Sequence, residues 1–330
     1  MKTLLIPFVA LASLGAAPAP KPALAPSEIV AAAPATDWIA IAPADMLVMT
    51  LANGKQAVIQ LMPPPFSQGW IGNIRKLAAA HWWDGLSINR LQDNYVVQWG
   101  DASEKKALPD GLVSVGEASY ETPLDFHYLT IGLVGGGISS GAAFPNFTPL
   151  SEKDAYASAT GFSKGWPIAA STPWPKSTKA MSQLERKPSS MKFWPIHCYA
   201  MVGVGRNLSP DTGSGAELYT VIGHAPRHLD RNIAVVGRVI SGIENLSSLP
   251  RGTGALGFYE KAEERVGITS IRLASELPAA DEPRFEYLST ESETFAAYAD
   301  ARANRRDAFF NVPAGGADIC NIPVPVRKKP

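Results

Sequence analysis

The first regular pattern in the chain is a pair of short apolar runs between residues 46 and 62, separated by an Asn-Gly pair. Asn-Gly between apolar runs is typical of the tight turn of a β-hairpin. After three prolines the spacing changes, and apolar residues recur every three or four positions: Trp70, Ile71, Ile74, Leu77 and Ala78. This period predicts a helix over about 67–80, directly after the hairpin.

Strand-like patterns account for much of the remaining chain. We expect one strand over 86–99 and later strands over residues 198–204, 217–222, 233–239 and 266–273. A short helix or turn is expected over 240–249, and a helix over about 291–309. Antiparallel strands in hairpin order with few helices indicate a β-barrel or sandwich with capping helices. The βαβ alternation of a doubly wound sheet is absent, which disfavours that fold.

Between these strands lies a long stretch, about residues 102–195, that is rich in Gly, Pro, Ser and Trp. We expect it to be irregular. So long a connection inside a compact domain is unusual, and it is often functional or an elaboration of one subfamily.

The N-terminus has the three parts of a secretory signal peptide: a basic start, an apolar run from Leu4 to Leu14, and the small residues after it. We expect a signal peptide over 1–17 and an Ala/Pro-rich leader over 18–40, flexible to about Thr36. No later stretch is apolar enough to cross a membrane. The expected location is therefore the periplasm of a Gram-negative host, with the medium as second choice.

The charge balance argues against nucleic-acid binding. The chain has 30 Lys and Arg against 30 Asp and Glu, with a pI near 7.0. The chain therefore has no net positive charge with which to bind the phosphates of a nucleic acid.

Two cysteines, Cys198 and Cys320, leave two possibilities open. An even pair in an oxidising compartment is typical of a disulfide. Two separate buried thiols fit the sequence equally well, because the sequence does not give the Cα separation that a bridge requires.

Two separated blocks carry a resemblance to a known family. Residues 83–90 read WDGLSINR and residues 95–101 read YVVQWGD, which is similar to the YDG-x-x-FHR and F-x-x-QGGD motifs of cyclophilins. In the second block, MVGVGR at 201–206, SGAELY at 214–219, LD at 229–230 and VVGRV at 235–239 resemble that family's later motifs in the same order. The resemblance spans roughly 46–273. Between Asp101 and His197 this chain is far longer than the family, and the tail after Leu273 lies outside the resemblance.

The resemblance implies a mainly β fold: a closed antiparallel eight-stranded barrel capped by two helices, with its substrate groove on the outer face. The barrel domain is expected over 41–274, with the insertion at about 102–195. A C-terminal extension with a helix is expected over 275–330. By the same resemblance we expect a peptidyl-prolyl cis–trans isomerase that works without a cofactor. Together with the predicted signal peptide, this implies action on X-Pro bonds of exported proteins. We expect a monomer that binds proline-containing segments.

The matching positions also imply roles for individual residues. Arg90 takes the place of the family's catalytic Arg, and Gln98 that of the Gln that orients it. The residues that match or adjoin the substrate-binding positions are Tyr95, Val96, Gly203, Glu217, Leu218, Tyr219, His228 and Leu229. For Val96 and Leu218, ordinary barrel core is an equally good interpretation.

Three departures from the family pattern affect the expected strength of the activity. Asn89 replaces a His, Gly203 an Asn that grips the substrate backbone, and Glu217 a Gln. Glu217 could place a carboxylate near Arg90, where it would hold the guanidinium and compete for its donors. We therefore expect weakened or substrate-restricted isomerase activity. The main alternative is a barrel of the same family that binds polypeptides as an envelope chaperone without useful catalysis.

Other chemistry has weaker support. Residues 137–141 match G-x-S-x-G, but Pro145 leaves little room for the helix that a Ser139 nucleophile elbow requires. A serine hydrolase is thus a remote alternative. The histidines lie in separate blocks without the spacing of a metal site, so we expect no metal.

Overall fold

The computed structural model describes residues 23–123, 130–134, 137–141, 148–151, 154–172 and 191–329. The predicted signal peptide over 1–17 lies outside these ranges and stays a prediction. Within them, no helix is both long and apolar enough to cross a bilayer.

The largest element is a closed barrel of eight antiparallel strands, as the resemblance implied. Its strands are β2 (Met46–Leu51), β3 (Gln56–Leu61), β4 (Ser87–Leu91), β5 (Val96–Gly100), β13 (Met201–Val204), β14 (Leu218–Val221), β15 (Val235–Ser241) and β16 (Val266–Leu273). Around the barrel the order is β13-β14-β5-β4-β16-β2-β3-β15. The predicted hairpin forms β2 and β3, and the Asn-Gly pair makes its turn with Gly54 at φ 79°.

The strand expected over 86–99 is in fact two strands, β4 and β5, which pair with each other. The chain reverses between them, where the N–H of Tyr95 donates to the carbonyl of Gln92 and Asn94 adopts φ 52°. Asn tolerates this left-handed conformation better than most residues, so Asp93-Asn94 was the turn signal in the sequence.

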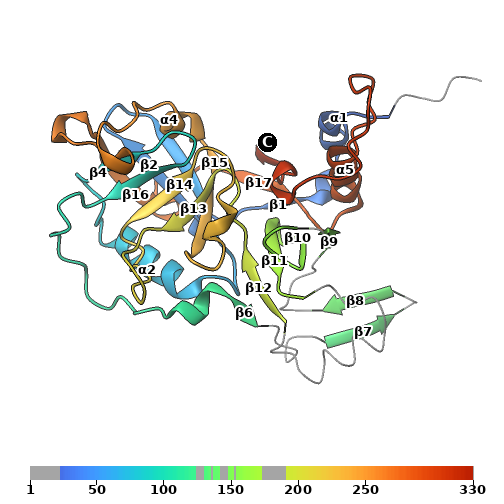
Figure 1. Cartoon of the computed structure of the whole chain (residues 1–330), viewed down its shortest axis with the longest axis horizontal. Coiled ribbons are helices and arrows are strands. Elements are labelled where there is room, and N and C mark those ends of the chain that lie inside the picture. Colours follow the sequence, from blue (N-terminus) through green and yellow to red (C-terminus); the bar gives the residue numbers. More distant parts are fainter. Residues whose placement is uncertain are drawn as a thin grey trace, which may run out of the picture.

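Two helices close the barrel and lie at its opposite ends in Figure 1. Helix α2 (Gln68–Ala79) buries the apolar stripe that predicted it: Trp70, Ile71, Ile74, Leu77 and Ala78. Helix α4 (Ile243–Ser247) packs against β3.

The insertion, expected to be irregular, contains a five-stranded antiparallel sheet in the order β6-β12-β11-β10-β9. Its strands are β6 (Thr122–Pro123), β9 (Thr148–Ser151), β10 (Ala159–Ser163), β11 (Trp166–Ala170) and β12 (Lys192–Pro195). Between β10 and β11, Lys164 and Gly165 both have positive φ, which is the geometry of a tight hairpin turn. A second hairpin pairs β7 (Thr130–Val134) with β8 (Gly137–Gly141). Figure 1 shows the five-stranded sheet beside the barrel.

The two ends of the chain meet next to that sheet. Strand β1 (Trp38–Ala40) pairs with β17 (Phe285–Leu288), which also pairs with β18 (Val326–Lys328). Helix α1 (Pro26–Ala31) packs against α5 (Glu293–Ala303), as Figure 1 shows. The leader expected to be flexible to about Thr36 therefore carries ordered structure from Pro26 onward. Helix α5 is shorter than the expected 291–309: it ends at Ala303 and is followed by the cap residue Asn304.

Cys198 and Cys320 form a disulfide that ties the C-terminal extension to the start of β13. Their Cα atoms are 5.1 Å apart, and 122 residues separate them in sequence. Because a cross-link that closes a long loop restricts the unfolded chain, we expect the Cys198→Ser, Cys320→Ser double variant to lose about 2–4 kcal/mol of unfolding free energy. Urea denaturation checks this, with reduced wild-type protein as the matched control. Equal midpoints for oxidised wild type and the double variant would show that the bridge contributes no stability.

Candidate functional site

The candidate site is a groove on the outer face of the barrel, above strands β4, β5 and β14. Arg90 lies opposite Gln98 on the neighbouring strand, and Gln98 lies opposite Tyr219 on the next. Directly opposed residues project from the same face of a sheet, so these side chains form one row. The groove has a volume of about 740 Å³, and its lining includes Arg90, Tyr95, Val96, Gln98, Glu217, Tyr219 and Leu229.

Alternation along the strands explains why this row faces outward. Leu91, Trp99 and Leu218, each next in sequence to a member of the row, are buried in the barrel core. Successive side chains of a strand point to opposite faces, so Arg90, Gln98 and Tyr219 point out of the barrel. Leu218, which we had placed beside the substrate, is thus a core residue and does not line the groove.

The Arg90 guanidinium is held from several sides by neutral acceptors. Its Nε donates to the carbonyl of Leu256 at 2.7 Å, its Nη1 to Gln98 Oε1 at 3.3 Å, and its Nη2 to Gln92 Oε1 at 2.5 Å. The rings of Tyr95 and Phe258 lie 5.7 Å and 5.3 Å from its central carbon.

No carboxylate forms an ion pair with Arg90 in the described part of the chain. Burial lowers the pKa of the guanidinium, although the ordinary pKa of arginine is so high that the group stays charged. Arg90 is thus a fixed cation whose charge is not neutralised by a neighbour.

Gln98 stands between Arg90 and Glu217. Its Oε1 accepts from Arg90, while its Nε2 donates to Glu217 Oε2 at 3.4 Å. The Asn89 amide also donates to Glu217 Oε2, at 3.4 Å. Burial raises the pKa of the Glu217 carboxyl, although these two hydrogen bonds oppose the shift. Glu217 therefore does not pair directly with Arg90, and both of its side-chain donors are uncharged amides.

An apolar pocket adjoins this polar row. Val96, Tyr219 and Val221 are buried together, and Leu229 and Ile233 pack against them with Tyr95. Val96 and Val221 are direct cross-strand partners, which closes the floor between β5 and β14. The apolar lining of this pocket suits a small apolar ring.

Gly203 lies directly beneath the side chain of Tyr219. A Cβ placed on Gly203 would come within 2.3 Å of the Tyr219 hydroxyl oxygen, so a larger side chain does not fit here. The hydroxyl lies 2.9 Å from His197 Nε2, and burial raises the pKa of Tyr219 well above its ordinary value. The position of the Tyr219 hydroxyl is thus compatible with glycine at 203 and not with the Asn that is common in the family.

The remaining predicted residues lie at or outside the rim. His228 is exposed, and its ring is stacked on Tyr95 with the ring centres 6.3 Å apart. Ser139 lies within β8 opposite Gly132, where it is not at the strand-to-helix turn of a nucleophile elbow. Over the described ranges, no group of His, Cys, Asp or Glu is arranged to hold a metal ion.

The structure also brings residues to the groove that the sequence analysis did not predict. Leu256 and Phe258 come from a loop far along the chain, and no local sequence pattern predicts their contact with Arg90. Gln92 lies two residues after Arg90, at the start of the turn between β4 and β5, and its short distance in sequence made it a candidate partner. His197 was not predicted to lie near the groove, where its ring contacts the Tyr219 hydroxyl.

Comparison with known proteins agrees with this geometry. Residues 70–273 match the family model of the cyclophilin type peptidyl-prolyl cis–trans isomerases. No curated protein matches the chain.

Among solved structures, the crystal structure of the cyclophilin AquaCyp293 from Hirschia baltica is similar over 88% of this chain and 92% of its own, with a TM-score of 0.61 and 19% identity. This likeness concerns the fold, and at 88% of the chain it extends beyond residues 70–273. A cyclophilin type isomerase from Cryptosporidium parvum, crystallised with the dipeptide Ala-Pro, covers 69% of this chain and 98% of its own, at 8% identity and a TM-score of only 0.36.

Proposed function

Because this chain belongs to the cyclophilin-type peptidyl-prolyl cis–trans isomerase family, we propose that it isomerises X-Pro bonds through Arg90 and the adjoining apolar pocket. The proline ring would enter the pocket between Tyr95, Val96, Tyr219 and Leu229. The prolyl nitrogen would then face the guanidinium.

The chemistry requires no nucleophile. Rotation about an X-Pro bond meets a barrier of roughly 18–20 kcal/mol because amide resonance resists twisting. In the twisted state a lone pair is localised on the prolyl nitrogen. A fixed donor aimed at that nitrogen stabilises the twisted state more than either planar isomer, and so lowers the barrier.

The observation that carries the proposal is the way in which Arg90 is held. A guanidinium has five N–H groups, and one each from Nε, Nη1 and Nη2 donates to Leu256, Gln98 and Gln92. The other two N–H groups of this preorganised cation have no acceptor in the described part of the chain. An arginine that served only to close a strand end would normally pair with a carboxylate.

A refolding assay tests the function against the chaperone alternative. The substrate is a protein whose slow refolding phase is limited by proline isomerisation. We expect catalytic amounts of this protein to accelerate that phase. A chaperone that binds the unfolded polypeptide without catalysis would instead suppress aggregation at equimolar amounts and leave the rate of the slow phase unchanged.

We also propose that the clients are exported proteins and that this chain acts in the periplasm. The basic and apolar N-terminus motivates this, and the disulfide supports it because such bonds persist in oxidising compartments. Fractionation of cells that express the full chain, followed by detection in the periplasmic extract, tests the location. Retention of an uncleaved chain in the cytoplasm would contradict it.

Glu217 gives the groove a further property that bears on substrate choice. Its carboxylate lines the groove and receives side-chain hydrogen bonds from Asn89 and Gln98, the two such donors among the described residues. The nearby Asp101 is also anionic: although burial opposes it, hydrogen bonds from Ser103, Lys105 and Lys106 lower its pKa to about 2. A basic residue next to the proline would place a positive charge near these two carboxylates.

We therefore expect a peptide with Lys before proline to show about fivefold higher kcat/KM than a peptide with Glu there, and Glu217→Gln to remove the difference. In the wild type the preference should be full above the raised pKa of Glu217 and fade as pH falls through it, because the protonated carboxyl is neutral. NMR exchange spectroscopy on the two peptides measures both effects. Glu104→Gln, at an exposed carboxylate on the groove edge, is the matched control. An undiminished Lys preference in Glu217→Gln would refute this role.

A further inference from the structure

Tyr219 forms one wall of the apolar pocket, and a chain of buried polar groups lies behind it. Its hydroxyl is 2.9 Å from Nε2 of His197, a residue with no exposed surface. On the other side of the imidazole, Nδ1 is 2.9 Å from Asp230 Oδ1. A carboxylate accepts hydrogen bonds, so these contacts assign the proton to Nδ1. In an imidazole that carries its single proton on Nδ1, Nε2 is an acceptor, and the Tyr219 hydroxyl can donate to it.

Asp230 is itself fixed by two further groups. Its Oδ1 also accepts from the backbone N–H of His197 at 2.9 Å, and its Oδ2 accepts from Arg227 Nε at 2.6 Å. Asp230 and Arg227 are 5% and 4% exposed, so the cluster is shielded from water. Its hydrogen bonds therefore constrain the imidazole more strongly than surface contacts would.

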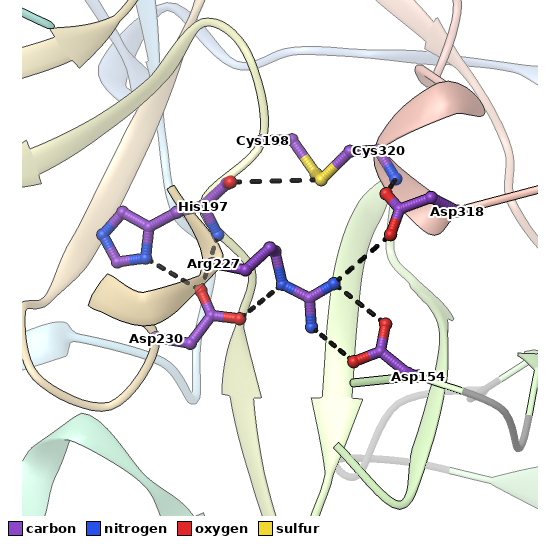
Figure 2. The surroundings of a disulfide bond; sticks show 7 residues. All are labelled: Asp154, His197, Cys198, Arg227, Asp230, Asp318 and Cys320. Atoms are coloured by element: carbon purple, nitrogen blue, oxygen red, sulfur yellow. Dashed lines mark hydrogen bonds and ion pairs between the residues drawn. A yellow bond between two sulfur atoms is a disulfide. The ribbon is translucent and has the colours of Figure 1, made fainter. Parts of the chain in front are cut away.

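The cluster continues into both accessory parts of the chain. Arg227 donates to the two carboxylate oxygens of Asp154 in the insertion at 2.9 Å and 3.0 Å. It also lies 3.8 Å from Asp318 in the C-terminal extension, two residues before Cys320. Figure 2 shows this arrangement: the His197 ring, Asp230, Arg227 and the two outer carboxylates lie next to the disulfide at Cys198.

Tyr219 is held between Gly203 and His197. Its ring passes over Gly203, and its hydroxyl is buried at a point where His197 is its hydrogen-bond partner. A buried hydroxyl without a partner is costly, so without His197 the side chain would turn until the hydroxyl reached water. That turn would carry the ring out of the pocket wall.

From these contacts we infer that His197 is a positioning residue for proline binding: it fixes Tyr219 as the pocket wall and is oriented in turn by Asp230 and Arg227. The inference rests on the proposed isomerase function. His197 does not touch the substrate and takes no part in the reaction at the prolyl nitrogen. The insertion and the C-terminal extension thereby support the site, although neither supplies this pocket wall.

The test uses His197→Leu, which removes the acceptor and leaves the Tyr219 hydroxyl unpaired. We expect KM for an Ala-Pro peptide to rise roughly tenfold, with kcat within about twofold of wild type because Arg90 and its partners are untouched. Adding Tyr219→Phe should restore KM to within about twofold of wild type, since a phenylalanine ring has no hydroxyl to satisfy. NMR exchange spectroscopy gives both constants.

This rescue separates a positioning role from a merely structural one. If His197 served only to hold the fold, a second substitution in the pocket would leave KM high or raise it further, and the inference would be overturned. Thermal unfolding of both variants shows whether each is folded at the assay temperature. If His197→Leu alone fails to fold, the KM of the double variant is compared with the KM of the Tyr219→Phe single variant. Equal KM values support the inference. A tenfold higher KM in the double variant overturns it.

Failure of the proposed function would look different. In that case the wild type would not accelerate exchange, yet the Kd for the Ala-Pro peptide, measured from chemical-shift changes, would still report on the pocket. A roughly tenfold weaker Kd in His197→Leu that recovers in the double variant would then uphold the positioning role without catalysis.

Discussion

Arg90→Ala is expected to lower kcat/KM for an Ala-Pro peptide by about 10²–10³-fold, the usual effect of removing one preorganised donor from a transition state. The loss should fall mainly on kcat. The apolar pocket between Val96, Tyr219 and Leu229 does not depend on the guanidinium, so peptide binding should weaken only slightly. NMR exchange spectroscopy measures the rate, and chemical-shift titration measures the affinity.

Arg90→Lys is the matched control for this prediction. It keeps the positive charge, but a lysine ammonium has neither the planar fork nor the reach to satisfy Leu256, Gln98 and Gln92 together. We expect an activity between those of wild type and Arg90→Ala. If Arg90→Ala turned over the peptide as fast as wild type, the mechanism would be wrong even though the family assignment would stand.

The second large effect concerns stability. Arg227→Met should lower the free energy of unfolding by about 3–5 kcal/mol, the usual result of breaking a buried ion pair by removing one partner. The substitution keeps an apolar stem of similar length but leaves the carboxylates of Asp154 and Asp230 buried without their cation. Urea denaturation at neutral pH measures the change.

Arg251→Met provides the control for the Arg227 prediction. Arg251 pairs with Asp93 at 2.8 Å, but both side chains are largely exposed, at 48% and 71%. Exposed pairs contribute less than about 1 kcal/mol because water and salt screen them. If the two variants unfolded at the same urea concentration, Arg227 would not be the structural link between the barrel and its accessory parts.

Much of the barrel could be predicted because its signals are local. The Asn-Gly turn located β2 and β3, and the three-to-four residue period located α2. The turn between β4 and β5 was missed because Asp93-Asn94 is a weaker signal than Asn-Gly and the apolar pattern on either side is continuous. The insertion was misjudged for a related reason, since its strands are short and Gly and Pro dominate its composition.

The row of Arg90, Gln98 and Tyr219 came from the family resemblance, and the strand register explains why those positions share a face. What the sequence could not supply were partners that meet only after folding. The Leu256 carbonyl lies 166 residues from Arg90. His197 lies 22 residues before Tyr219, whose hydroxyl is its hydrogen-bond partner.

The structure also gives a physical reason for two departures from the family pattern. Gly203 lacks a side chain because the Tyr219 hydroxyl occupies that space. Glu217 lies near Arg90 but does not form an ion pair with it, because Gln98 lies between them and hydrogen bonds to both. Neither departure removes the donor groups on which isomerisation depends, so we expect restricted substrate choice rather than lost chemistry.

The most direct test of this account is the cis–trans exchange rate of an Ala-Pro peptide, followed by NMR with catalytic amounts of wild-type protein. The account predicts exchange well above the uncatalysed rate, which is slow on the scale of tens of seconds, and a return to that rate with Arg90→Ala. Exchange at the uncatalysed rate in the presence of folded wild-type protein that binds the peptide would contradict it.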